Sequence, residues 1–129
     1  MADLITVETL QSGLALVTLN RPERRNALCI AMLDQLCETV EHLGADPSNR
    51  ALILRGAGPT FSAGLDLAEA SNLALVQPSA HTVARTFQLM RTTRLVTIAA
   101  VHGGAYAGGA GLMAACDMAI GTSDLKICF

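Results

Sequence analysis

The sequence predicts an α/β fold, in which buried strands alternate with helices within one domain. Three observations lead to this prediction. The 129 residues are one domain's worth, 51% of them are hydrophobic, and short apolar runs alternate with segments of helical period. Aromatic residues make up only 3%, so the interior must be built mainly from Ala, Leu, Val and Ile, which suits layers of helices and sheet.

The chain is predicted to begin with a hairpin and a helix. Residues 4–9 and 13–20 are β-rich and alternate as paired strands do. In the loop that follows, Asn26 is expected to cap a helix. Apolar residues recur every three or four positions over 28–43, which predicts an amphipathic helix that stops at Gly44.

The middle and end of the chain continue the alternation. Residues 51–56 and 96–101 are short apolar runs, as expected of strands that are covered on both faces. Residues 70–79 are weakly patterned and are expected to form a loop, before a helix near 80–93. Strand, helix and strand in this order predict a right-handed crossover. Residues 115–129 are expected to add further short strands.

Charge and cysteine content narrow the classes of function. The formal net charge of −2 gives no electrostatic basis for binding nucleic acid or an anionic membrane. The one basic group, Arg21, Arg24 and Arg25, suits either a single anionic ligand or a solvated loop. The four cysteines show neither CxxC nor metal-ligand spacing, so we expect no metal site. Cys29 and Cys37 fall within the helical pattern and are expected to be buried.

The two ends of the chain carry further expectations. The first ten residues have neither a basic region nor a long apolar stretch, so no targeting signal is expected and a reducing, cytoplasmic location is predicted. The last residues are strand-like with no turn or polar tail after them. A chain that stops there would expose a sheet edge. We therefore expect residues 1–129 to be the N-terminal part of a longer domain, whose C-terminal part is absent.

The stretch HGGAYAGGAGLMAACD, residues 102–117, holds five of the eleven glycines. Two alternative interpretations of this stretch are a membrane span and a dinucleotide-binding loop. Residues 95–115 are long enough to cross a bilayer and carry no full charge, although Ala and Gly contribute little transfer energy. Residues 109–114 match the GxGxxA dinucleotide pattern, but that pattern should follow a strand directly, and here HGGAYA intervenes.

Two loops of similar design indicate a different site. FSAGLDL, residues 61–67, follows one predicted strand, and GGAYAGGAGL, residues 103–112, follows another. Each has small residues where a backbone can approach a ligand, and each leads toward a helix start, where amides are unpaired. Two such amides aimed at one point would form an oxyanion hole. The alternative is that the glycines only allow close packing of helix on sheet.

Together with LNRPERRNAL, these two segments resemble the crotonase superfamily, the enoyl-CoA hydratases and isomerases. The resemblance runs from about Ile5 to the last residue. It implies a spiral of repeated ββα units, here truncated, and an assembly of trimers or hexamers in the full-length protein. It also implies an acyl-CoA thioester as substrate, with coenzyme A as part of that substrate and no separate cofactor.

The resemblance assigns roles by position. The oxyanion donors would be the backbone N–H groups of Leu65 and Gly108. Arg25 and Ala27 would meet the nucleotide end of coenzyme A, and Ala68 stands where many relatives have a phosphate-binding lysine. The implied substrate-binding residues as a set are Arg25, Ala27, Ala63, Gly64, Leu65, Asp66, Leu67, Gly108 and Gly109.

The chain departs from the family pattern at the residues that would transfer protons. Typical hydratases of this family use two glutamates, and the first would stand at Gly111, which has no side chain. The second would fall about two residues beyond Phe129. Asp66 and Asp117, the nearest carboxylates, are expected to order a loop and a helix end. The leading hypothesis is an enoyl-CoA hydratase or isomerase, and the alternative is a non-catalytic acyl-CoA-binding or assembly protein.

Overall fold

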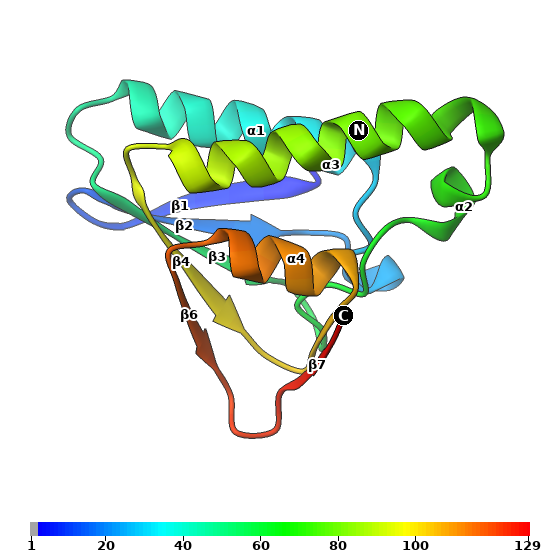
Figure 1. The fold of residues 1–129 in the computed structure, drawn as a ribbon. Helices are drawn as coiled ribbons and strands as arrows, with labels where there is room; N and C mark the ends of the chain where they lie inside the picture. Colours follow the sequence, from blue (N-terminus) through cyan, green and yellow to red (C-terminus); the bar gives the residue numbers. More distant parts are fainter. Residues whose placement is uncertain (1–2) are drawn as a thin grey trace.

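The computed structural model describes residues 3–129 and has one main sheet with its helices on one side (Figure 1). The strands of this sheet follow the order β1-β2-β3-β4-β6, with β1 antiparallel to β2 and every other pair parallel. Their bounds are β1 Ile5–Gln11, β2 Leu14–Leu19, β3 Ala51–Gly56, β4 Val96–Val101 and β6 Met118–Gly121. The predicted hairpin, the two strands and the α/β class are confirmed. The expectation that both strands are covered on both faces is wrong, because the helices cover one face only and residues on the other face, such as Arg55 of β3 and Val96 of β4, are exposed.

The remaining elements lie above the sheet or at its end. The helices are η1 Pro22–Arg24, α1 Ile30–Ala45, α2 Leu67–Ala70, α3 Leu73–Thr92 and α4 Gly108–Ala115. A second, two-stranded parallel sheet pairs β5, Gly104–Tyr106, with β7, Lys126–Cys128. In Figure 1, α1, α3 and α4 all lie on the same side of the main sheet.

The core fills the space between the sheet and these helices. Alternate strand residues such as Val17, Leu52 and Leu54 are fully buried and face the helices. α1 places its apolar stripe over them, and each fully buried leucine contributes about 1.5–3 kcal/mol. The buried residues of α1 are Met32, Leu33, Leu36, Cys37, Val40 and Leu43. Cys29 and Cys37 are buried, as expected.

Asn26 does not cap α1, contrary to the prediction. Its side chain is fully buried, donates to the carbonyls of Ala57 and Thr60, and accepts from the N–H of Arg21. Its φ of 54° is left-handed, a conformation that asparagine tolerates. α1 instead begins after Cys29. Asn26 stays in the loop before the helix, where its side chain connects this loop to the loop after β3.

The loop predicted over 70–79 is also wrong, because α3 already begins at Leu73. Asn72 caps the helix by accepting a hydrogen bond from the N–H of Ala74 at 3.0 Å. Leu73 is 92% exposed and Val76 is 43% exposed, so the first turns of α3 do not cover the core. The first turns of α3 therefore have no apolar stripe, which is the sequence pattern that would have predicted a helix there.

The glycine-rich stretch is not a membrane span. Residues 95–115 fold as β4, β5 and α4, with turns between them. Over residues 3–129, the structure contains no helix with the length and hydropathy needed to cross a bilayer. α1 continues one residue past Gly44, and the expected short strands near the end are β6 and β7.

Candidate functional site

The loop after β3 is held against the segment before α1 by an isolated parallel bridge between Leu28 and Leu65. The bridge uses the N–H of Leu28 on the carbonyl of Gly64, at 2.7 Å, and the N–H of Asp66 on the carbonyl of Leu28, at 3.1 Å. Because successive peptide groups along an extended chain point to opposite sides, the N–H of Leu65 faces away from Leu28. Within residues 3–129 this N–H has no hydrogen-bond acceptor.

Gly108 begins α4, so its N–H belongs to the first turn, where a helix supplies no acceptor. The N–H of the preceding residue, Ala107, donates to the carbonyl of Cys128 at 2.6 Å. A Cβ placed on Gly108 would stand 3.5 Å from the nitrogen of Leu65. The two free N–H groups are therefore neighbours at the mouth of α4, and the described residues offer neither of them an acceptor.

The two loops meet backbone to backbone, which explains their glycines. Ser62 forms a bridge with Ala105 of β5. A Cβ on Gly109 would stand 2.4 Å from the carbonyl oxygen of Ser62, and one on Gly64 would stand 2.8 Å from that of Tyr106. Gly64 also has a φ of 100°, which favours glycine. The glycines thus let the two loops pack closely, and the same close packing places the amides of Leu65 and Gly108 next to each other.

A cavity of about 620 Å³ opens beside these loops. Several of the residues that the sequence assigned to substrate binding line it, namely Arg25, Ala27, Ala63, Leu65, Asp66 and Leu67. Gly64, Gly108 and Gly109 do not line it and instead form the backbone contacts just described. The structure therefore brings most of the predicted set to one cavity.

The cavity has walls that the sequence analysis did not assign. Tyr106 and Glu23 line it, as does Ala68, the position noted for its missing lysine. The ring of Tyr106 lies over Gly104, where an added Cβ would stand 2.4 Å from a ring carbon. Tyr106 falls inside the quoted glycine-rich stretch, but only the fold of β5 brings this residue to the cavity.

Arg21 is not free for an anionic ligand. Its guanidinium lies 2.7 Å from the carboxylate of Asp66. That contact, together with the N–H of Glu69 donating to Asp66, holds the pKa of the Asp66 carboxyl below its usual range despite its burial. Arg24 and Arg25 remain exposed at the cavity. Asp66 orders its loop, as predicted.

Asp66→Ala is expected to lower the free energy of unfolding by about 1–2 kcal/mol near neutral pH, because the α2 cap and the partner of Arg21 are lost together. A lowered folded-state pKa stabilises above the unfolded value of about 3.9, and this is lost as pH falls through the folded value. Urea unfolding at neutral pH and near pH 3 measures both effects. Asp34→Ala, which removes only an exposed contact of 3.8 Å to Arg85, is the control and should change little. An equal loss for both variants would contradict the prediction.

Two other titratable groups near α4, Asp117 and Cys116, are hydrogen-bonded or buried within the fold. Asp117 accepts from the N–H of Thr97 at 2.9 Å and donates its own N–H to the Thr97 hydroxyl at 2.8 Å. This pair ties the segment after α4 to β4. Burial raises the pKa of the Cys116 thiol to about 11, so it stays protonated at neutral pH. In residues 3–129, no group of three His, Cys, Asp or Glu side chains is placed to hold a metal ion.

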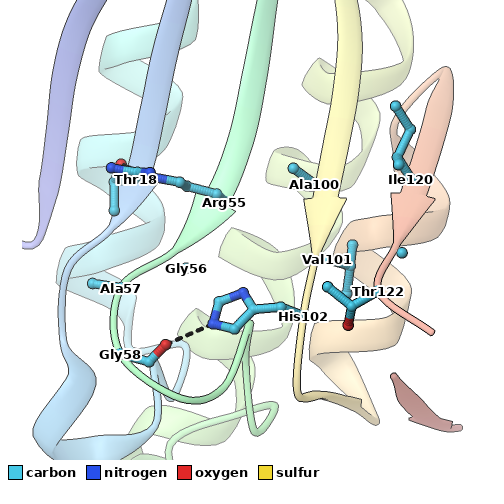
Figure 2. Close-up of a pocket in the computed structure, with 11 residues that line it drawn as sticks. Thr18, Arg55, Gly56, Ala57, Gly58, Ala100, Val101, His102, Ile120 and Thr122 are labelled. Atoms are coloured by element: carbon cyan, nitrogen blue, oxygen red, sulfur yellow. Dashed lines mark hydrogen bonds between the residues drawn. The ribbon is translucent and has the colours of Figure 1, made fainter. Parts of the chain in front are cut away.

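A second cavity, of about 650 Å³, lies on the helix-free face of the sheet, at the ends of β3 and β4 (Figure 2). Arg55 and Ile120 are among its walls, and His102 shares a hydrogen bond of 2.6 Å with the carbonyl of Gly58. This hydrogen bond ties the end of β4 to the loop after β3. Neither Leu65 nor Gly108 reaches this cavity.

Fold and site together define the class: an α/β protein in which two neighbouring backbone amides, without acceptors among residues 3–129, lie on loops that follow parallel strands, and one of these loops lines a cavity. The sequence model of the Enoyl-CoA hydratase/isomerase family matches residues 9–127. The chain therefore belongs to the enoyl-CoA hydratase/isomerase family, whose members include enzymes of both named activities.

Individual relatives agree. A Thermus thermophilus protein provisionally named an enoyl-CoA hydratase is 39% identical over 94% of this chain and 50% of its own. The mouse mitochondrial Delta(3,5)-Delta(2,4)-dienoyl-CoA isomerase is 35% identical over 93% of this chain and 41% of its own. The solved enoyl-CoA hydratase/isomerase of Xanthobacter autotrophicus superimposes with a TM-score of 0.89 at 38% identity, over 98% of this chain and 49% of that one. The fold is thus that of the crotonase family, and the chain spans about half the length of the relatives it matches.

Proposed function

We propose that the protein binds an enoyl-CoA thioester and holds the thioester oxygen with the N–H groups of Leu65 and Gly108, as an enoyl-CoA hydratase or isomerase. One observation carries the proposal: these two amides are neighbours and lack acceptors within residues 3–129, and Leu65 lines the 620 Å³ cavity. Family membership supplies the substrate class, because relatives named as hydratases and isomerases act on enoyl-CoA or dienoyl-CoA.

The chemistry follows from where charge develops. When a proton leaves or a nucleophile adds beside a thioester, negative charge moves onto the carbonyl oxygen. The amide of Gly108 is one donor, and the start of α4 adds a positive end of the helix dipole. The amide of Leu65 is the second donor, held in place by the bridge to Leu28. Both donors are fixed before substrate binds, so little reorganisation is needed during the reaction.

The rest of the substrate has places in the same cavity. Arg24 and Arg25 are exposed at its rim and are proposed to meet the phosphates of coenzyme A. Asp66 is paired with Arg21, and Asp117 is paired with Thr97, so neither is proposed as the proton carrier. An assembly of trimers or hexamers and a cytoplasmic location stay predictions.

Calorimetric titration of the complete protein tests the proposal. Crotonyl-CoA is compared with free coenzyme A and with a thioether analogue that lacks the carbonyl oxygen. We expect the thioester to bind more tightly than the thioether, because only the thioester offers an oxygen to the two amides. Equal affinity for both would overturn the role of the amides. Tight thioester binding without turnover of crotonyl-CoA or of a 3-enoyl-CoA would favour the alternative of a non-catalytic acyl-CoA-binding protein.

A further inference from the structure

The first turn of α4 presents two glycines on one face, Gly108 and Gly111. The side chain of Leu65 lies against the first, 3.4 Å from the position of an added Cβ. The ring of Phe87 lies against the second, with two of its carbons 2.8 and 3.0 Å from the corresponding position. Phe87 comes from α3, which packs beside α4 (Figure 1). Its ring therefore fills the space that any side chain at position 111 would need.

We propose that Phe87 determines acyl specificity, with its ring as an apolar wall of the acyl subsite next to the Gly108 amide. This inference rests on the proposed function. Gly111 lies three residues, about 4.5 Å along the helix axis, from Gly108. An acyl group whose thioester oxygen is bound at Gly108 has its first carbons within a few bonds of that oxygen, so they come close to whatever covers Gly111.

The burial of the ring supports this role. Phe61, which packs only in the core, is fully buried, whereas Phe87 is partly exposed at the edge of the core. The ring therefore packs on α4, and the residue keeps part of its surface exposed. An apolar wall at this point disfavours polar groups, and its bulk disfavours branching beside the thioester. The substrate class that fits is an unbranched, apolar acyl chain.

Two acyl-CoA probes test this inference in the complete protein. Butyryl-CoA and 2-methylbutyryl-CoA differ only by a branch beside the thioester, and neither carries a double bond to react. Their Kd ratio is measured by calorimetry for the natural protein, for Phe87→Ala and for Leu89→Ala. Leu89 is also a partly buried apolar residue of α3, but it lines a different surface, together with Glu41.

We expect the natural protein to prefer the unbranched probe and Phe87→Ala to reduce that preference by roughly tenfold, the factor that corresponds to about 1.4 kcal/mol. Leu89→Ala should leave the ratio unchanged. The ratio is taken within each variant, so a loss of folded protein cancels. If Phe87→Ala does not fold, Phe87→Leu should shift the ratio in the same direction by a smaller factor.

The outcomes separate the two proposals. If both probes bind more tightly than coenzyme A and the ratio is the same in Phe87→Ala and Leu89→Ala, the role of Phe87 is overturned while the proposed function stands. If neither probe binds more tightly than free coenzyme A in the natural protein, the proposed function fails first.

Discussion

Gly108→Pro is expected to lower the turnover of the complete protein by about 10²- to 10³-fold, the cost of removing one oxyanion donor. Proline has no N–H, and it is well tolerated at the first position of a helix, so the substitution removes the donor. Steady-state kinetics with crotonyl-CoA or a 3-enoyl-CoA measures the effect. A melting curve of the variant checks that it is folded.

Gly108→Ala is the matched control for this prediction. Its added Cβ would stand 3.4 Å from the nearest atom of the Leu65 side chain, an ordinary contact at the end of a flexible group. The N–H remains, so turnover should stay within a few-fold of the natural value. Comparable losses in the alanine and proline variants would show that bulk at this position matters and that the donor does not.

Gly109→Ala is expected to reduce both stability and thioester affinity. The new Cβ would stand 2.4 Å from the carbonyl oxygen of Ser62, which is backbone and cannot rotate away. Overpacking of this kind costs about 1–3 kcal/mol, and relief requires α4 to move off the Ser62 loop, which separates the Leu65 and Gly108 amides. Urea unfolding measures the stability, and calorimetry with crotonyl-CoA measures the affinity.

Gly44→Ala is the control for this second prediction. The residue lies in the last turn of α1, and its Cβ would stand 3.6 Å from the Thr93 hydroxyl, an ordinary contact. Alanine in a helix is favoured over glycine by about 0.5–1 kcal/mol, so this variant should be slightly more stable and bind as before. A Gly109→Ala variant as stable as Gly44→Ala would contradict the packing argument.

The elements that the sequence predicted well are those whose period reports burial. Residues 28–43 and 51–56 pack directly against the core. Their apolar residues therefore occur where α1 and β3 face the core, and this pattern made both elements predictable. The start of α3 was missed because Leu73 and Val76 are exposed, and no stripe forms. Asn26 was assigned to the wrong partner, because a polar residue in a loop does not reveal which distant carbonyls it will bind.

Some features of the candidate site could likewise be predicted from the sequence, and others could not. The motifs around Leu65 and Gly108 led to the family, because short glycine-rich loops carry a recognisable order and spacing, and the family match confirms the family itself. The roles of the two amides stay predictions. Tyr106 and Phe87 were not assigned, because each acts on a glycine through the direction of its ring, which depends on how β5 and α3 are placed.

The sequence by itself determined the α/β class, the family and the identity of the loops, since these depend on local period and on motifs that lie along the chain. Only the tertiary structure decided that two amides find no acceptor among residues 3–129, that Arg21 is paired with Asp66, and that an aromatic ring covers Gly111. The physical reason is that a backbone hydrogen bond or a side-chain contact across a site joins residues far apart in the chain, and local preference carries no information about which distant group will arrive.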